Sequence, residues 1–232
     1  MQLQNTSLIT NSYLKAYYKF EGNSNDTTAN AHNGTDTTVS YGNQYGKFLQ
    51  GAYYPGSGYT TMSDSTDFKP TSTYSVNVWL KCSSVTSAAF FSSSWIQTNP
   101  NNGYYGLELW ITGGKPRVIH YYTTSLLDTI TTTSTIDDGK WHMVTYVYAS
   151  TTEKIYIDGV LDSTTSSLHN PAYGAQNYIY MGSRSVYNAG GPIAQSDNYT
   201  GTMDELAFFN GYALSQSEID SLYGSPFPGC II

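Results

Sequence analysis

The 232-residue chain is rich in hydrophobic (39%) and aromatic (15%) residues and poor in charged ones (12%), so it has material for a core and lacks the composition of a disordered segment. Its net charge of −7 and pI near 4.8 leave no basic face for phosphates, which argues against a nucleic-acid partner. No stretch approaches the roughly 18 apolar residues of a membrane span, and no secretory signal is recognisable at the N-terminus.

Alternation of apolar and polar residues with a period of two recurs along the chain and predicts a β architecture. Strands are expected at residues 14–20, 74–81, 104–111, 141–148, 154–161, 178–182 and 201–209. In the first, alternate residues from Leu14 to Phe20 share one face, which predicts a half-buried strand. Residues 141–148 are apolar on both faces, as expected in the middle of a sheet. Asp158-Gly159 supplies the two positive-φ positions of a tight hairpin turn.

One helix is predicted, near the C-terminus. Residues 214–223 have a helical period, with Ser215 as the N-cap and Glu218 completing a capping box. The chain has no internal linker or repeat. We therefore expect an N-terminal arm (1–12), one domain (13–224) and a C-terminal tail (225–232).

Four segments, taken together and in order, carry a family resemblance. They are AYYKFEGN from residue 16 with its following loop, YSVNVWLK from 74, DGKWHMV from 138 with the hairpin after it, and GTMDELA from 201. In these segments the chain resembles the laminin-G-like (LamG) domains of the concanavalin A-like lectin/glucanase superfamily. The resemblance implies an all-β fold, a two-sheet antiparallel jelly-roll sandwich with one short C-terminal helix.

The resemblance also implies a cation site, because the family often holds a cation near the positions that match Asp26 and Asp204. Calcium takes several oxygen ligands, and the loop after the first strand is rich in Asn, Asp and Thr. We therefore predict a structural calcium ion held by Asp26 and Asp204. The alternative is that Asp26 caps a turn and Asp204 is a solvated carboxylate. Cys82 is expected to be a buried thiol, and a bridge to Cys230 stays open.

Glucan hydrolases of the same superfamily carry paired acidic residues in a Glu-x-Asp-x-Glu pattern, which is absent here. Glu108 stands alone on its strand. Asp204 and Glu205 are adjacent, so in a regular strand they would point to opposite faces and could not flank one glycosidic bond. We therefore expect no enzyme and no catalytic residues.

Aromatic side chains in loops form the expected recognition surface, because flat rings stack on sugar faces while flanking amides and hydroxyls bond to sugar hydroxyls. We predict ligand-binding residues at Trp95, Tyr104, Tyr105 and Tyr187. Further candidates are Tyr53, Tyr54, Tyr59 and Tyr173. The alternative for each is an ordinary strand position, since tyrosine forms strands well and the chain has 23 of them.

These features favour a non-enzymatic, lectin-like module, extracellular or on a particle surface, that recognises a glycan or another surface. A second hypothesis is a structural protein of a virus or phage particle, such as a decoration, fibre or spike protein. In that case the residues at both ends would contact capsid or fibre subunits. The fold alone does not decide between the two.

Overall fold

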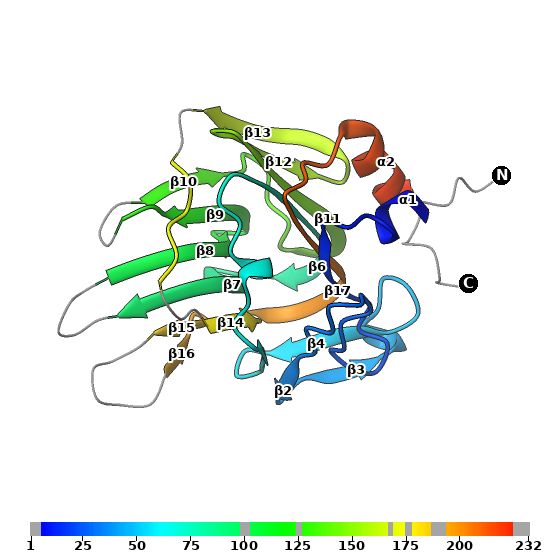
Figure 1. The fold of residues 1–232 in the computed structure, drawn as a ribbon. Coiled ribbons are helices and arrows are strands. Elements are labelled where there is room, and N and C mark those ends of the chain that lie inside the picture. The colour runs from blue at the N-terminus through cyan, green and yellow to red at the C-terminus, as the bar shows by residue number, and fades with distance from the viewer. Residues whose placement is uncertain are drawn as a thin grey trace.

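Two stacked antiparallel sheets form the body of the molecule (Figure 1). The computed structural model describes residues 6–97, 103–123, 127–166, 169–174, 178–186 and 194–224. Within these ranges, the larger sheet has eight strands. Its spatial order is β13 (Val160–Ser166), β12 (Thr152–Ile157), β11 (Asp138–Ala149), β6 (Thr73–Ser83), β17 (Thr200–Asn210), β4 (Gly51–Pro55) and β3 (Ser40–Gly42), with β1 (Leu14–Tyr18) paired to β17. The predicted all-β jelly-roll sandwich is confirmed.

The smaller sheet has seven strands in the described ranges. Its spatial order is β10 (Leu127–Thr131), β9 (Lys115–Tyr121), β8 (Gly103–Thr112), β7 (Ser87–Gln97), β14 (Tyr178–Met181), β5 (Tyr59–Met62) and β2 (Thr35–Thr37). A separate hairpin consists of β15 (Arg184–Val186) and β16 (Ala194–Ser196). The helical elements are α1 (Thr6–Ile9), η1 (Asn43–Tyr45), η2 (Thr66–Phe68) and α2 (Gln216–Gly224). Neither α-helix is long enough to cross a bilayer.

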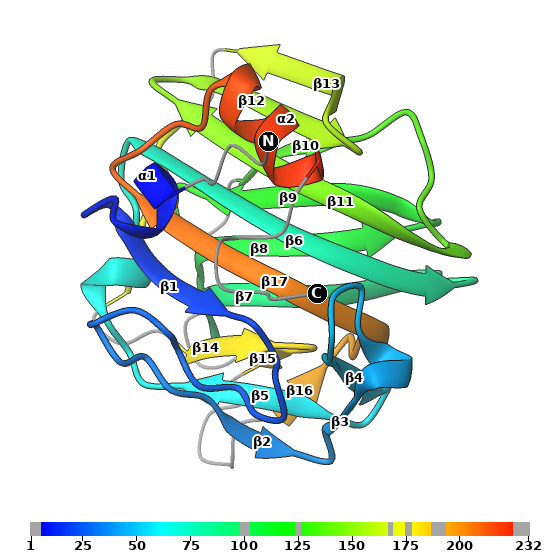
Figure 2. The same cartoon turned by 90° about the vertical axis from the view of Figure 1, so that its right-hand side faces the viewer.

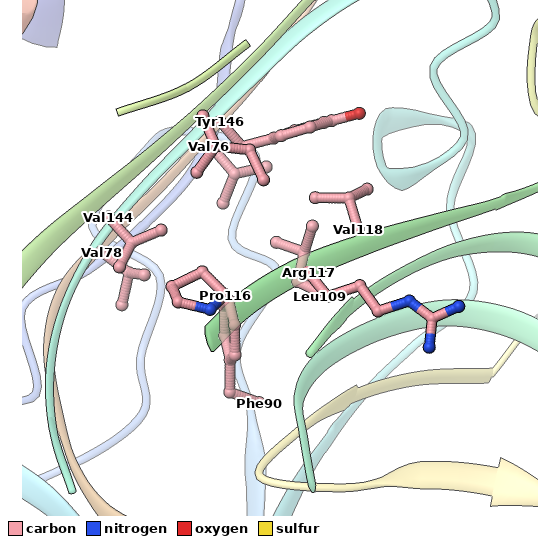
Figure 3. Close-up of a pocket in the computed structure, with 10 residues that line it drawn as sticks. Val76, Val78, Phe90, Leu109, Pro116, Arg117, Val118, Val144 and Tyr146 are labelled. Atoms are coloured by element: carbon pink, nitrogen blue, oxygen red, sulfur yellow. The ribbon is translucent and has the colours of Figure 1, made fainter. Parts of the chain in front are cut away.

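The main hydrophobic core lies between the two sheets, as the period-two pattern predicts. In β6, Val76, Val78 and Leu80 face this core, and in β8 Leu107 and Leu109 do so from the opposite sheet. Figure 3 shows side chains of both sheets that meet around a small space. The volume of this space is about 10 Å³. This volume is about that of one water molecule, so the interior is not a ligand cavity.

A second cluster covers the outer face of the larger sheet and is formed with α1 and α2, which lie over its upper half in Figure 2. Leu8 is only 1% exposed there, so part of the segment predicted as an N-terminal arm packs against the domain. The predicted capping box starts α2, since the Ser215 backbone N–H donates to Glu218 Oε2 over 2.8 Å. The two ends of the described chain thus lie on the same face.

Strand β1 differs from its prediction as a half-buried strand. Its pairing with β17 shifts register between Leu14 and Ala16, so Leu14 joins Tyr17 in the outer cluster while Ala16 and Tyr18 face the main core. The strand is therefore buried on both faces. The predicted hairpin between β12 and β13 is confirmed, with φ of 53° at Asp158 and 82° at Gly159. Cys82 is a buried free thiol, and Cys230 lies outside the described residues.

Candidate functional site

The outer face of the seven-stranded sheet carries a group of aromatic side chains around β8 and β9. The Tyr104 ring stacks on the Tyr121 ring, with centroids 5.4 Å apart and 24° between the planes. Trp110 and Ile119 complete this cluster, and all four face away from the main core. They do so because successive side chains of β8 and β9 point to opposite faces of the sheet, and Leu107, Leu109 and Ile111 face the main core. Of the predicted ligand-binding residues, Tyr104 belongs to this group.

Of the other three predicted ligand-binding residues, the structure describes the side chain of Tyr105 only. Trp95 lies opposite Tyr105 in the pairing of β7 with β8, but the Trp95 side chain is outside the described part of the structure. Tyr105 is half-buried at the start of β8. Tyr187 lies outside the described residues. The prediction of ligand binding at these positions therefore stays a prediction, although Trp95 and Tyr105 come from the same sheet end as Tyr104.

Two further aromatic candidates are turned inward. Tyr54 is 0% exposed and belongs to the main core, so its prediction as a surface recognition residue is wrong. The Tyr173 hydroxyl is buried, and this desolvation raises the Tyr173 pKa well above its ordinary value. Tyr53 and Tyr59 remain half-buried, with part of each side chain accessible.

A buried carboxylate lies at the centre of the outer face. Glu108 is 0% exposed, and its oxygens accept hydrogen bonds from Ser94 Oγ at 2.9 Å, Trp110 Nε1 at 2.9 Å and Tyr121 Oη at 3.3 Å. Burial raises the Glu108 pKa, and the positive charge of Arg184 together with these donors opposes that rise. The side chain is thus fully engaged in holding the surrounding aromatic groups.

Arg184 brings a cation to this carboxylate from another part of the chain. Its Nη1 is 3.7 Å from Glu108 Oε2, its Nε donates to Asp197 Oδ2 over 2.7 Å, and its guanidinium carbon lies 4.8 Å from the Trp110 ring centroid. Burial lowers the Arg184 pKa, but the Glu108 and Asp197 charges outweigh this, so the pKa is raised. The side chain is 21% exposed, so a planar, permanently charged donor is held partly open to solvent. We call Tyr104, Glu108, Trp110, Tyr121, Arg184 and Asp197 the Arg184 cluster.

The β15–β16 hairpin fixes the position of Arg184. The chain turns sharply after β14 at Gly182, where φ is +78° and a Cβ atom would lie 2.3 Å from the Tyr54 ring. Only glycine fits such a turn without strain. The backbone N–H of Ala89 on β7 then donates to the Asp197 carbonyl over 2.8 Å, which fastens the far end of the hairpin to the sheet.

Asp26, one predicted calcium ligand, is engaged by the protein itself. Its two oxygens accept hydrogen bonds from the backbone N–H groups of Tyr17, Thr28 and His32 at 2.9–3.0 Å, and from Thr28 Oγ1 at 2.8 Å. These contacts tie the loop after β1 to the strand itself. A cation would have to displace several of these donors, so the Asp26 carboxylate fits a turn-capping role better than a metal ligand.

Asp204 and its neighbour Glu205 lie at a β-bulge in β17. Asp204 pairs with Trp79 and Ala207 with Asn77, so β17 has one residue more than β6 over this interval, and Glu205 has φ of 53°. Asp204 Oδ2 accepts the backbone N–H groups of Lys47 and Phe48, and Glu205 accepts the Tyr17 hydroxyl. Both carboxylates therefore lie on the outer face of the sheet. The expectation that they point to opposite faces is wrong, because the strand is not regular at the bulge.

Of the two predicted calcium ligands, only Asp204 has a carboxylate oxygen that is left without a hydrogen-bond partner. Its Oδ1 is buried without a hydrogen-bond partner, and burial, with the Glu205 charge beside it, raises the Asp204 pKa to about 8. No hydrogen bond joins Asp204 to Asp26. Among the described residues, no group of three or more His, Cys, Asp or Glu is arranged to hold a metal ion. The calcium site remains a prediction, and we derive no function from it.

The sequence contained a signal for part of the Arg184 cluster. The alternation that turns Leu107 and Leu109 inward also turns Glu108 and Trp110 outward, next to the predicted Tyr104. No comparable pattern in the sequence predicted that Arg184 belongs to this cluster. Arg184 lies on a hairpin more than 70 residues further along the chain, and the sequence around it is rich in turn residues.

The two stacked antiparallel sheets define a jelly-roll sandwich, and the Arg184 cluster lies on the outer face of the smaller sheet. The sequence matches the family model Laminin_G_3, of the concanavalin A-like lectin/glucanases superfamily, over residues 54–220. This span is more than half of the chain, so the protein belongs to that family, and the predicted resemblance is confirmed. Among curated proteins, none matches the sequence.

Several solved structures share the fold. Domain 4 of AbnA, an extracellular arabinanase of Geobacillus stearothermophilus solved with arabinotriose, is 24% identical with a TM-score of 0.67, covering 90% of this chain and 98% of that one. The binding domain of Paraclostridial Mosquitocidal Protein 1 is 15% identical, with a TM-score of 0.71 and coverages of 93% and 53%. The ligand-binding domain of botulinum neurotoxin serotype D, solved with N-acetylneuraminic acid, is 16% identical, with a TM-score of 0.62 and coverages of 91% and 50%. The chain thus spans about half of each toxin domain.

Proposed function

We propose that this protein is a non-catalytic glycan-binding module, extracellular or on a particle surface, and that it binds a neutral saccharide at the Arg184 cluster. One observation carries the proposal: a partly exposed guanidinium lies with its central carbon 4.8 Å from the Trp110 ring centroid, beside the Tyr104–Tyr121 stack. Aromatic faces pack against sugar rings, and a fixed planar donor bonds to hydroxyl groups. The arabinotriose complex of an arabinanase domain with the same fold supports the ligand class.

The charge of the cluster favours a neutral ligand. Two carboxylates, Glu108 and Asp197, surround the single guanidinium of Arg184, so an anionic sugar would meet repulsion as well as attraction. The same engagement supports a non-catalytic role. Glu108 is fully buried and bonded, whereas a general acid or base must reach the bond that it cleaves.

Titration calorimetry with neutral oligosaccharides, beginning with arabinotriose, tests this proposal. We expect Tyr104→Ala and Arg184→Lys each to weaken binding by about tenfold or more, since each removes a contact worth roughly 1.4 kcal/mol or more. Tyr13→Ala is the matched control, because Tyr13 is an exposed tyrosine (47%) that stacks on Tyr212, near α2. Binding that survives both cluster variants, or a screen of neutral glycans without any binder, would contradict the proposal.

The alternative role in a virus or phage particle rests on contacts made by the chain ends. Residues 1–5 and 225–232 lie outside the described part, so their contacts with capsid or fibre subunits stay a prediction. The purified chain offers a direct test, since a stable monomer that binds no particle protein would remove the basis for this role.

A further inference from the structure

A row of four side chains crosses the outer face of the larger sheet, on the opposite side of the molecule from the Arg184 cluster. Tyr53 on β4 pairs with Thr202 on β17, Thr202 with Lys81 on β6, and Lys81 with Trp141 on β11. The neighbours of three of these residues, Ala52, Met203 and Leu80, face the main core, so the row itself faces outward. With strands about 4.8 Å apart, an aromatic ring, a hydroxyl and an ammonium group follow one another along one line.

An open groove of about 330 Å³ lies beside this row, where β4 and β17 meet η1. One wall is a pair of tyrosine rings: Tyr45 and Tyr53 are stacked with centroids 5.0 Å apart and planes inclined by 16°. Hydrogen-bonding groups come from Gln44, Thr200 and Thr202. The volume lies within the range of small-ligand sites, and the aromatic wall with polar groups around it is a saccharide-binding combination.

The charge of the groove is opposite to that of the chain as a whole. The protein carries a net charge of −7, yet none of the described residues that line the groove is acidic. Lys81 is exposed and forms no ion pair within the described ranges. Asp138, opposite Ser83 at the rim, is already paired with Lys140 at 2.9 Å. The Lys81 ammonium is therefore available to an anion.

A second ammonium group lies on the same face. Lys47 Nζ is 4.3 Å from the centroid of Trp79, which precedes Lys81 by two residues and so points the same way. Lys47 and Lys81 thus place two ammonium groups on the outer face at this end of the sheet.

We propose that this groove is a second saccharide site, separate from the Arg184 cluster, and that it binds an acidic saccharide. The sugar ring packs on the Tyr45–Tyr53 pair, and its carboxylate or sulfate group pairs with Lys81. The module then has two sites on opposite faces, one for a neutral and one for an anionic sugar.

Calorimetry on the full chain tests this with three probes: trigalacturonic acid, its neutral methyl ester, and a sulfated carrageenan disaccharide, which carries a sulfate group but no carboxylate. We expect at least one acidic probe to bind, and to bind about tenfold more tightly than the methyl ester. If only one acidic probe binds, the result identifies the anion as carboxylate or sulfate. Absence of binding by both acidic probes at millimolar concentration, or equal binding of the methyl ester, overturns the proposal.

Variants locate the site. Lys81→Met and Tyr53→Ala are each expected to weaken binding of the acidic probe by about tenfold or more, while Lys81→Arg retains it within about threefold. Lys154→Met is the matched control, because Lys154 lies on β12 of the same sheet but outside the groove. Tyr104→Ala, which tests the first site, is expected to leave this binding unchanged, so the two proposals fail independently. The assignment is contradicted if Lys154→Met loses binding of the acidic probe, or if Lys81→Met binds it as tightly as the native protein does.

Discussion

The two outer faces of the sandwich differ in how their charged side chains are paired. On the seven-stranded sheet, Glu108 is buried and paired, and Arg184 of the β15–β16 hairpin lies between two carboxylates. On the eight-stranded sheet, Lys81 is exposed and unpaired within the described ranges, while Asp204 is buried with one oxygen lacking a partner. A buried charge is tolerated only with compensation, and the first face is accordingly a network of paired charges. The second face combines an open groove with a buried carboxyl group whose pKa is raised by burial.

The largest expected effect is the loss of the Glu108 carboxylate. Glu108→Ala leaves Arg184 without its buried partner and removes the acceptor of three hydrogen bonds, so we expect a loss of about 3–5 kcal/mol in the free energy of unfolding. Urea denaturation measures this. Lys81→Met on the other face is the control and should change stability by less than about 0.5 kcal/mol. Similar losses in both variants would show that the two faces do not differ in this way.

Asp204 is expected to make stability depend on pH. Its pKa is about 8 in the folded protein and near 3.9 when unfolded, so the folded state binds the extra proton between these values and stability falls as pH rises from about 4 to 8. Asp204→Asn removes this loss. We expect the variant to gain on the order of 4 kcal/mol relative to the native protein between pH 5 and pH 9. Thermal unfolding at both pH values measures it, and a constant difference would contradict the assignment.

Calcium provides a smaller test of the same carboxyl group. If Asp204 is a ligand, calcium at ten times its dissociation constant should stabilise the native protein by about 1.4 kcal/mol, and the effect should vanish in Asp204→Asn. Scanning calorimetry with calcium and with EDTA measures the difference. Asp26→Asn then decides whether both predicted ligands act together. An identical melting temperature in calcium and EDTA would remove the calcium prediction.

The smallest expected effect concerns the cation–aromatic contact between Lys47 and Trp79. Lys47 lies over Trp79 with its ammonium exposed, and Lys47→Met should cost only about 0.5–1 kcal/mol. Arg184→Met removes both a contact with Trp110 and two ion pairs, and should cost several times more. Equal costs would indicate that the ion pairs around Arg184 contribute little.

The sequence predicted features that depend on local pattern. The alternation in β6 and β8, the Asp158-Gly159 turn and the Ser215 capping box all follow from residues within a few positions of each other, and the structure confirms them. It also predicted Tyr104 as a surface aromatic. These signals survive because strand and helix periodicity are set by the backbone itself.

The remaining features depend on contacts that local pattern does not encode. The bulge at Asp204 and Glu205 is visible only when β17 is paired with β6, and it reverses the predicted orientation of these carboxylates. Arg184 reaches Glu108 through tertiary packing of a separate hairpin. The Tyr53–Thr202–Lys81 row joins three strands that are far apart in the chain, and no single segment carries it.

The packing of Leu8 and Leu222 into one cluster also governs how the module would be presented. Both helices lie on the outer face of the eight-stranded sheet (Figure 2), on the opposite side of the sandwich from the Arg184 cluster. A surface bound to the helical face would therefore leave the Arg184 cluster uncovered, and several copies held in this way would present it in parallel to one polysaccharide.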